Sequence, residues 1–176
     1  MTGPRTPPRH LTTATTVALA ALTLAACGGA DGSGDRASGR QEAPYWAEGV
    51  TFARVAELLR VTVPGTATER TAAVQRGFQD DGLLLAFVLP EAETGRFVAG
   101  LAPEQPLVRR AEAAFTAAEY RPTTPFAHLG LPEPETLDEV TTGPVCAPCG
   151  GDLNSLEVTV APLDGDRARI YLRGVD

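Results

Sequence analysis

The chain has 176 residues, enough for one domain of ordinary size and a short leader. Hydrophobic residues make up 43% of it and charged residues 21%, which is typical of a globular protein and excludes a disordered chain. The formal net charge is -7, and it becomes -9 beyond residue 26, where 13 arginines face 22 acidic residues and lysine is absent. Because such a surface repels phosphate backbones, we expect no nucleic-acid partner.

Residues 1–26 have the layout of a signal peptide. Arg5 and Arg9 form a basic start, and the stretch from Val17 to Ala26 is almost unbroken apolar. Even counted from Leu11, this stretch is shorter than the ~20 residues that cross a hydrocarbon core, so we expect no permanent transmembrane helix. A buried core helix is the alternative, but the basic residues before it and the glycines after it favour a signal peptide.

The leader ends in Leu24-Ala25-Ala26-Cys27, which resembles the lipobox of bacterial lipoproteins. The resemblance implies cleavage before Cys27, a diacylglycerol thioether on its sulfur, and an exported protein held on the outer face of the cell membrane. Two acyl chains hold a protein stably at a bilayer, whereas one chain gives marginal attachment. Ordinary signal-peptide cleavage, which would leave a free thiol at Cys27, is the alternative.

Residues 27–44 form the predicted lipidated linker. The stretch is rich in glycine and small polar residues and lacks hydrophobic periodicity, so it predicts a flexible spacer that buries no core. Four of its side chains fall on ligand positions of a calcium loop: Asp31, Ser33, Asp35 and Glu42. Arg36 stands where that loop needs glycine, so we expect no calcium site.

Residues 45–176 contain all ten aromatic side chains and are expected to form a single globular domain. Apolar side chains at helical spacing predict a short helix from Phe52 to about Arg60. A strand is expected to follow at Val61–Val63, closed by a proline-glycine turn.

The next segment, Thr66–Phe78, fits two structures. A capping box at its start favours a helix, whereas its alternating apolar residues favour a strand. We favour the strand, because the turn Gln79–Gly82 then joins it to an apolar strand at Leu83–Leu89 in a β-hairpin.

Two helices are predicted after this hairpin. Pro90 ends the strand, and Glu91 and Glu93 favour a helix start, with Phe97 on the buried face. Apolar residues at helical spacing predict a further helix over Leu107–Tyr120, with Phe115 among the side chains that face the core.

The last part of the chain changes in character. Six prolines in the stretch Arg121–Pro148 predict little regular structure there. Apolar and polar residues then alternate over Leu156–Val160 and again over Ala168–Leu172, on either side of the turn Asp164-Gly165. This pattern predicts a C-terminal β-hairpin.

These elements indicate an α+β domain, with an antiparallel sheet of about four to five strands and two or three helices on one face. A Pro-Gly-Thr-Ala-Thr turn, a Phe-Gln-Asp-Asp-Gly turn and a Leu-Pro-Glu step before Phe97 resemble a pattern of small uncharacterised lipoproteins of high-GC Gram-positive bacteria. That resemblance implies no activity.

Cys146-Ala147-Pro148-Cys149 is the sharpest motif of the domain. Two cysteines three residues apart are within disulfide reach, and an exported chain meets an oxidising compartment, so we expect a local disulfide. The motif also resembles the active site of thioredoxin-like oxidoreductases, which implies redox catalysis. In those enzymes the cysteines lie at a helix N-terminus, whereas glycine-rich segments without helical pattern flank this motif. A structural zinc site needs four ligands, and His128 is the only histidine beyond the leader.

Residues for other kinds of catalysis are sparse. Ser155 is the only serine of the domain and lacks a nucleophile-elbow sequence, and His128 is expected to pack in a loop beside Phe126. Adjacent acids such as Asp80 and Asp81 are expected to be solvated in a turn. We find no phosphate-binding glycine loop and expect no catalytic set, metal site or cofactor.

The residues therefore indicate a lipid-anchored, non-catalytic binding domain whose partner is an envelope protein, peptide or glycan. Tyr45-Trp46 can form an aromatic platform for such a ligand, although a tryptophan at a domain edge more often covers the core. The alternative function is an extracytoplasmic thiol-disulfide oxidoreductase that uses Cys146 and Cys149.

The anchor is tested by Cys27→Ser in the full chain. Without the sulfur that receives diacylglycerol, the protein should remain uncleaved or be released, and labelling by a fatty-acid analogue should be lost. The measurement is metabolic labelling with fractionation of the cells, and labelling equal to that of the unchanged chain contradicts the lipobox assignment.

Overall fold

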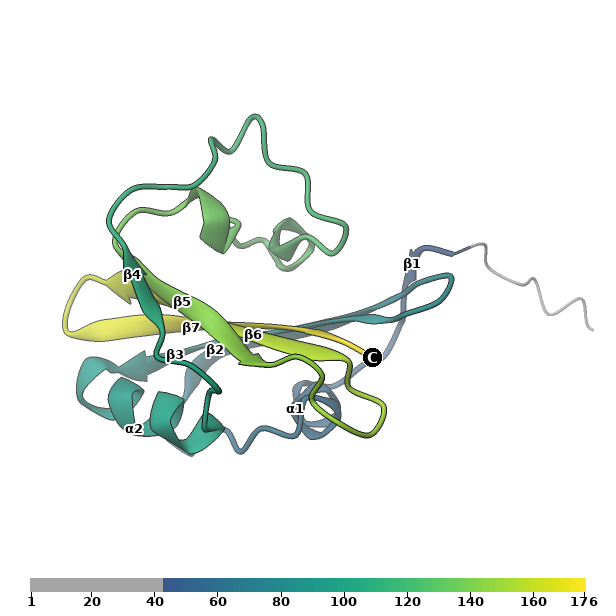
Figure 1. The fold of residues 1–176 in the computed structure, drawn as a ribbon, viewed down its shortest axis with the longest axis horizontal. Coiled ribbons are helices and arrows are strands. Elements are labelled where there is room, and N and C mark those ends of the chain that lie inside the picture. The colour runs from purple at the N-terminus through teal and green to yellow at the C-terminus, as the bar shows by residue number, and fades with distance from the viewer. Residues whose placement is uncertain (1–42) are drawn as a thin grey trace, which may run out of the picture. The chain divides into compact units, whose positions relative to one another are not determined.

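The computed structural model describes residues 43–176, in which seven strands form one sheet with every neighbouring pair antiparallel (Figure 1). The strands, in chain order, are β1 (Tyr45–Trp46), β2 (Thr68–Arg76), β3 (Gly82–Pro90), β4 (Val108–Arg110), β5 (Val140–Cys146), β6 (Ser155–Leu163) and β7 (Arg167–Val175). Their order across the sheet is β1-β2-β3-β7-β6-β5-β4. The expectations for the signal peptide, for Cys27 and for most of the linker concern residues 1–42 and lie outside the described residues.

Two helices, α1 (Phe52–Leu58) and α2 (Glu91–Leu101), cover one face of the sheet (Figure 1). The other face is covered by the segment between β4 and β5, which contains the 3-10 helices η1 (Phe126–Leu129) and η2 (Pro134–Thr136). The predicted α+β class is confirmed. The expected four to five strands are too few, because β1, β4 and β5 were not predicted. No helix in residues 43–176 is long and apolar enough to cross a membrane.

Strand β3 lies at the centre of both cores. Each residue from Leu83 to Leu89 is at most 1% exposed, and alternate side chains point to opposite faces. Leu83, Leu85, Phe87 and Leu89 join the large core under the helices, whereas Leu84 and Ala86 join a smaller core on the other face. A continuous apolar run is therefore explained by burial on both sides of the sheet.

Helix α1 is held at both ends. Thr51 caps its start, because the hydroxyl oxygen accepts a hydrogen bond from the Arg54 backbone N–H at 3.2 Å. Beyond its last turn, Leu59 packs against β7 at Gly174, where an added Cβ would lie 2.3 Å from a Leu59 methyl carbon. Glycine at this position allows the end of the helix to approach the sheet closely.

Helix α2 begins where the sequence predicted and buries the side chain that was expected to face the core. Glu91 and Glu93 lie in its first turn, where acidic side chains interact favourably with the helix dipole, and Phe97 is buried. The Phe97 ring meets the Phe87 ring edge-on, with 5.2 Å between their centroids. This contact joins the helix to β3.

Both predicted hairpins are confirmed. The ambiguous segment after Pro64 forms β2, which pairs with β3 and ends before a turn at residues 77–81. Strands β6 and β7 pair along their whole length, from Ser155 opposite Val175 to Leu163 opposite Arg167.

The predicted helix over Leu107–Tyr120 is wrong. Val108–Arg110 instead pairs with Val140–Thr142 as β4, and turns follow. Phe115, expected to face the core, is 49% exposed. Pairing with a strand 30 residues further along the chain outweighs the helical propensity of this alanine-rich stretch.

Two smaller expectations are also wrong. Val61–Val63 forms no strand, and Val61 and Thr62 line a cavity instead. The proline-rich stretch contains β5 and both 3-10 helices, because its prolines occupy places that tolerate them. Pro134 begins η2, and Pro144 lies beside an irregularity in the β5–β6 pairing.

Phe87→Ala tests the central role of β3. Removing a fully buried ring that touches Phe52 and Phe97 should lower the free energy of unfolding by ~3–5 kcal/mol, as measured by denaturant unfolding. The matched control is Phe78→Ala at the tip of the β2–β3 hairpin, where the side chain is 93% exposed and the change should stay within about 0.5 kcal/mol. Equal effects of the two substitutions contradict this description of the core.

Candidate functional site

A cavity of ≈ 470 Å³ opens on the helix side of the sheet. Helix α1 contacts β2 and β3, and α2 contacts β3 and β7, so the cavity lies where neither helix covers the ends of β5 and β6. Its floor consists of side chains of the large core: Leu59, Phe97, Val145, Leu153 and Leu156. The floor is therefore apolar.

Two arginines, Arg60 and Arg96, line this cavity. The structure describes eleven arginines, and the other nine each donate a hydrogen bond to a carboxylate or to a backbone carbonyl. Within residues 43–176, the guanidinium groups of Arg60 and Arg96 make no hydrogen bond or ion pair. The two guanidinium groups without a protein acceptor thus lie at one cavity.

The one acidic side chain of the cavity, Glu93, is engaged elsewhere. Its carboxylate accepts a hydrogen bond of 2.6 Å from the Thr66 hydroxyl, and no ion pair joins it to Arg60 or Arg96 in the described part of the chain. The lining therefore carries one more positive than negative group, in a domain where acidic residues outnumber arginines.

Gly151 leaves the space that the guanidinium group of Arg60 occupies. It has a φ of +60°, and an added Cβ would lie 2.1 Å from a terminal guanidinium nitrogen of Arg60. The glycine thus meets two requirements at once, a left-handed backbone and room for the guanidinium group.

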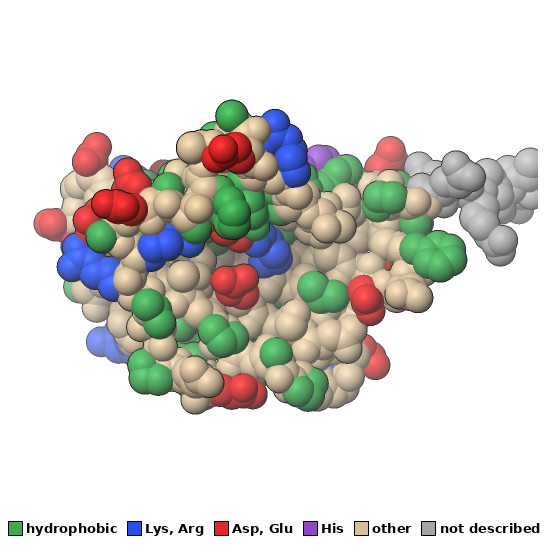
Figure 2. Space-filling view, turned by 45° about the horizontal axis from the view of Figure 1, so that its top comes forward, with side chains coloured by type: hydrophobic (Ala, Val, Ile, Leu, Met, Phe, Trp, Pro, Cys, Tyr) green, Lys and Arg blue, Asp and Glu red, His purple; other side chains and the backbone are tan. Residues whose placement is uncertain are grey.

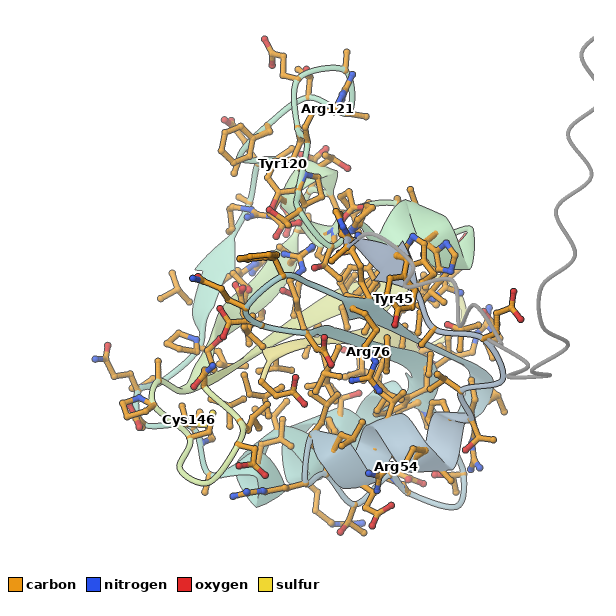
Figure 3. All side chains as sticks on the ribbon, turned by 90° about the vertical axis from the view of Figure 1, so that its right-hand side faces the viewer. Tyr45, Arg54, Arg76, Tyr120, Arg121 and Cys146 are labelled. Carbon is orange, nitrogen blue, oxygen red and sulfur yellow. A yellow bond between two sulfur atoms is a disulfide. The ribbon has the colours of Figure 1, made fainter. Side chains whose placement is uncertain are left out.

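Cys146 and Cys149 form a disulfide that also lines the cavity. Figure 3 places Cys146 on the side of the sheet that carries Arg54 of α1, opposite the segment with Tyr120. The Cys149 N–H donates to the Asn154 carbonyl, and the Asn154 N–H donates to Val175 of β7 at 2.7 Å. The disulfide loop is therefore fastened to the sheet.

The surroundings of this disulfide differ from those of a thioredoxin-like site. Cys146 ends β5, a turn follows, and the next element is the strand β6, so no helix begins at either cysteine. The helix dipole that lowers a thiol pKa in such enzymes is thus missing here.

A second hollow of ≈ 390 Å³ lies on the other side of α2 and is lined by apolar side chains such as Val98, Leu107 and Val160. A neighbouring hollow of ≈ 480 Å³ shares part of its walls. The latter contains Arg109 and Arg167, but these guanidinium groups already pair with carboxylates of Glu139 and Glu69. The guanidinium charges there are satisfied within the protein.

On the opposite face of the sheet, Arg173 lies between Glu133 and Glu135 and forms an ion pair with each. Burial raises the pKa of Glu135, but the hydrogen bond and charge of Arg173 outweigh burial and hold that pKa below its ordinary value. Burial, followed by a hydrogen bond to Glu135, raises the pKa of Tyr120 to about 12. This cluster fixes η2 to β7 and is structural.

The remaining predicted residues lie apart from one another. His128 stacks on Trp46, with 3.7 Å between ring centroids and planes 1° apart, so one face of the expected aromatic platform is covered. Ser155 begins β6 and makes no hydrogen bond to His128 in the described residues. No group of three metal-ligating side chains occurs in residues 43–176.

Charges are interspersed on the surface. On the face drawn in Figure 2, acidic side chains lie beside the basic ones, and hydrophobic side chains are scattered between them. The chain matches no protein-family model, no curated protein and no solved structure.

The sequence motifs led to the disulfide but not to Arg60 and Arg96. These arginines are 36 residues apart, Arg60 just beyond the end of α1 and Arg96 on α2, and no spacing rule joins them. Only the lack of a guanidinium partner within residues 43–176 distinguishes them.

Glu135→Gln tests the charge cluster through pH. The pKa of Glu135 is lowered in the folded state, so its stabilising effect is present above the ordinary pKa of glutamate and is lost as pH falls through the lowered value. The free energy of unfolding of the variant should be ~2 kcal/mol lower than that of the unchanged protein near neutral pH. Between about pH 5 and about pH 3 the variant should lose less stability than the unchanged protein does. Denaturant unfolding across this range is the measurement.

The matched control is Glu112→Gln, which removes an exposed carboxyl that has no hydrogen bond or ion pair within residues 43–176. Its pH profile should equal that of the unchanged protein. An unchanged profile for Glu135→Gln as well contradicts the role given to the cluster.

Proposed function

We propose that this protein is a lipid-anchored extracytoplasmic binding protein, and that its domain holds a small ligand, or the end of an envelope peptide or glycan, in the cavity beside the disulfide. The observation that carries the proposal is the cavity itself. Its ≈ 470 Å³ falls within the ~300–1,000 Å³ typical of ligand sites, and its lining is apolar with a few charged groups. No catalytic set accompanies it in residues 43–176.

The proposed location follows from the leader. Cleavage before Cys27 and acylation of its sulfur would attach the protein to the outer face of the membrane. Residues 28–44, as a flexible coil, would span ~21–25 Å and hold the domain away from the headgroups. A disulfide at Cys146 and Cys149 suits the oxidising environment outside the cell.

A thiol-disulfide oxidoreductase is the second candidate. One observation favours it: both sulfur-bearing residues line the cavity, where a substrate can meet them. The strand-to-turn context of Cys146 lacks the helix N-terminus of such enzymes, so we rank the binding protein first.

Gly100→Phe tests the cavity as the ligand site. Gly100 lines the cavity on α2 and has no heavy atom within 4 Å of an added Cβ, so the new ring should enter the cavity without disturbing the fold. The probe is phenylnaphthylamine, a neutral dye that fluoresces in apolar surroundings, titrated into residues 43–176. This segment contains every described strand and both cores. We expect binding to weaken about ten-fold, or ~1.4 kcal/mol.

The matched control is Gly95→Phe. Gly95 is also on α2 and equally free of neighbours, but it lines the hollows on the other side of the helix. It should bind the dye like the unchanged protein, and both variants should keep their thermal unfolding transition. Absence of dye binding, or weakening by Gly95→Phe alone, contradicts the proposed site.

A further inference from the structure

We propose that the cavity beside the disulfide binds a small anionic amphiphile, whose apolar body lies on the cavity floor and whose carboxylate or phosphate group binds Arg60 and Arg96. This inference rests on the proposed function and specifies the ligand class of the same site. It depends on two observations, the apolar floor and the pair of arginines without acceptors.

The arginines indicate the charge of the ligand. A guanidinium group presents five donors in a planar fork that fits a carboxylate or phosphate. Within the described residues, nine of eleven arginines use protein acceptors, and the two that do not share one cavity. The local excess of positive charge is notable because 19 acidic residues face 11 arginines in residues 43–176. Both arginines are exposed and can be hydrated, and an anion is the ligand whose charge and acceptors match this pair.

The floor indicates the rest of the ligand. Leu59, Val145 and Leu156 are at most 5% exposed, and they offer no hydrogen-bonding side chain to a polar molecule. A free inorganic anion would leave this apolar surface in contact with water, whereas an attached alkyl or aromatic group would cover it. An apolar floor beside two arginines fits an anionic amphiphile better than a bare inorganic anion.

The two neighbouring hollows lack the combination of features on which the proposed ligand class depends. The hollow beside Val98 is apolar but has no arginine, and the one beside Arg109 has arginines that already pair with carboxylates. Only the cavity beside the disulfide joins an apolar floor to unpaired guanidinium groups among the described residues.

The experiment compares two dyes of nearly the same body. Anilinonaphthalene sulfonate carries an anionic group, and phenylnaphthylamine does not. Each is titrated into residues 43–176 of the unchanged protein and of Arg60→Gln, Arg96→Gln and the double variant. We expect each single substitution to weaken the anionic dye about three-fold and the double about ten-fold, while the neutral dye changes less than about two-fold.

Arg54→Gln is the control, because Arg54 lies on α1 outside the cavity and pairs with Glu57. It should change neither dye. Added salt should reduce the preference for the anionic dye in the unchanged protein and leave the double variant unaffected. Displacement by decanoate monomers identifies a free acid as the ligand, and displacement only by phosphatidylglycerol vesicles identifies a lipid headgroup.

Different experimental outcomes would contradict the proposed binding site and the proposed anionic ligand. If the neutral dye binds and Gly100→Phe blocks it, but the double arginine variant keeps the same ratio of affinities for the two dyes, then the anionic ligand is wrong and the binding site stands. If neither dye binds the unchanged protein, then both proposals are wrong.

Discussion

The burial of β3 on both faces is the constraint on which the rest of the structure depends. Its residues 83–89 are almost completely buried and alternate between two cores, so each face of the sheet must be covered. The helices α1 and α2 cover one face and the β4–β5 segment covers the other (Figure 1). Strand β3 pairs with β7 over nine residues on one side and with β2 on the other, and this pairing provides hydrogen-bond partners for its backbone N–H and C=O groups.

The cavity is a consequence of this arrangement. Two short helices of seven and eleven residues cannot cover a sheet of seven strands, and they lie over β2, β3 and β7. Beyond them, the disulfide loop closes part of the gap at the ends of β5 and β6. The floor residues, at most 7% exposed, border this gap together with Arg60 and Arg96.

The sequence predicted those elements whose signals are local. Both hairpins and α2 were found, because alternation, Asp-Gly turns and the Pro90 boundary lie within each element. Strand β4 and strand β5 were missed, because Val108–Arg110 becomes a strand only by pairing with Val140–Thr142. The motif of Cys146 and Cys149 marked one wall of the cavity. The role of Arg60 and Arg96 could not be predicted in the same way, because it depends on which acceptors the fold brings near the other nine described arginines.

The most direct test of the cavity is a titration of methyl-labelled protein with anilinonaphthalene sulfonate, followed by nuclear magnetic resonance. We expect the largest shifts at methyl groups of Leu101, Leu153 and Leu156, which line the cavity. Shifts confined to Val98, Leu107 and Val160, on the other side of α2, would contradict this expectation.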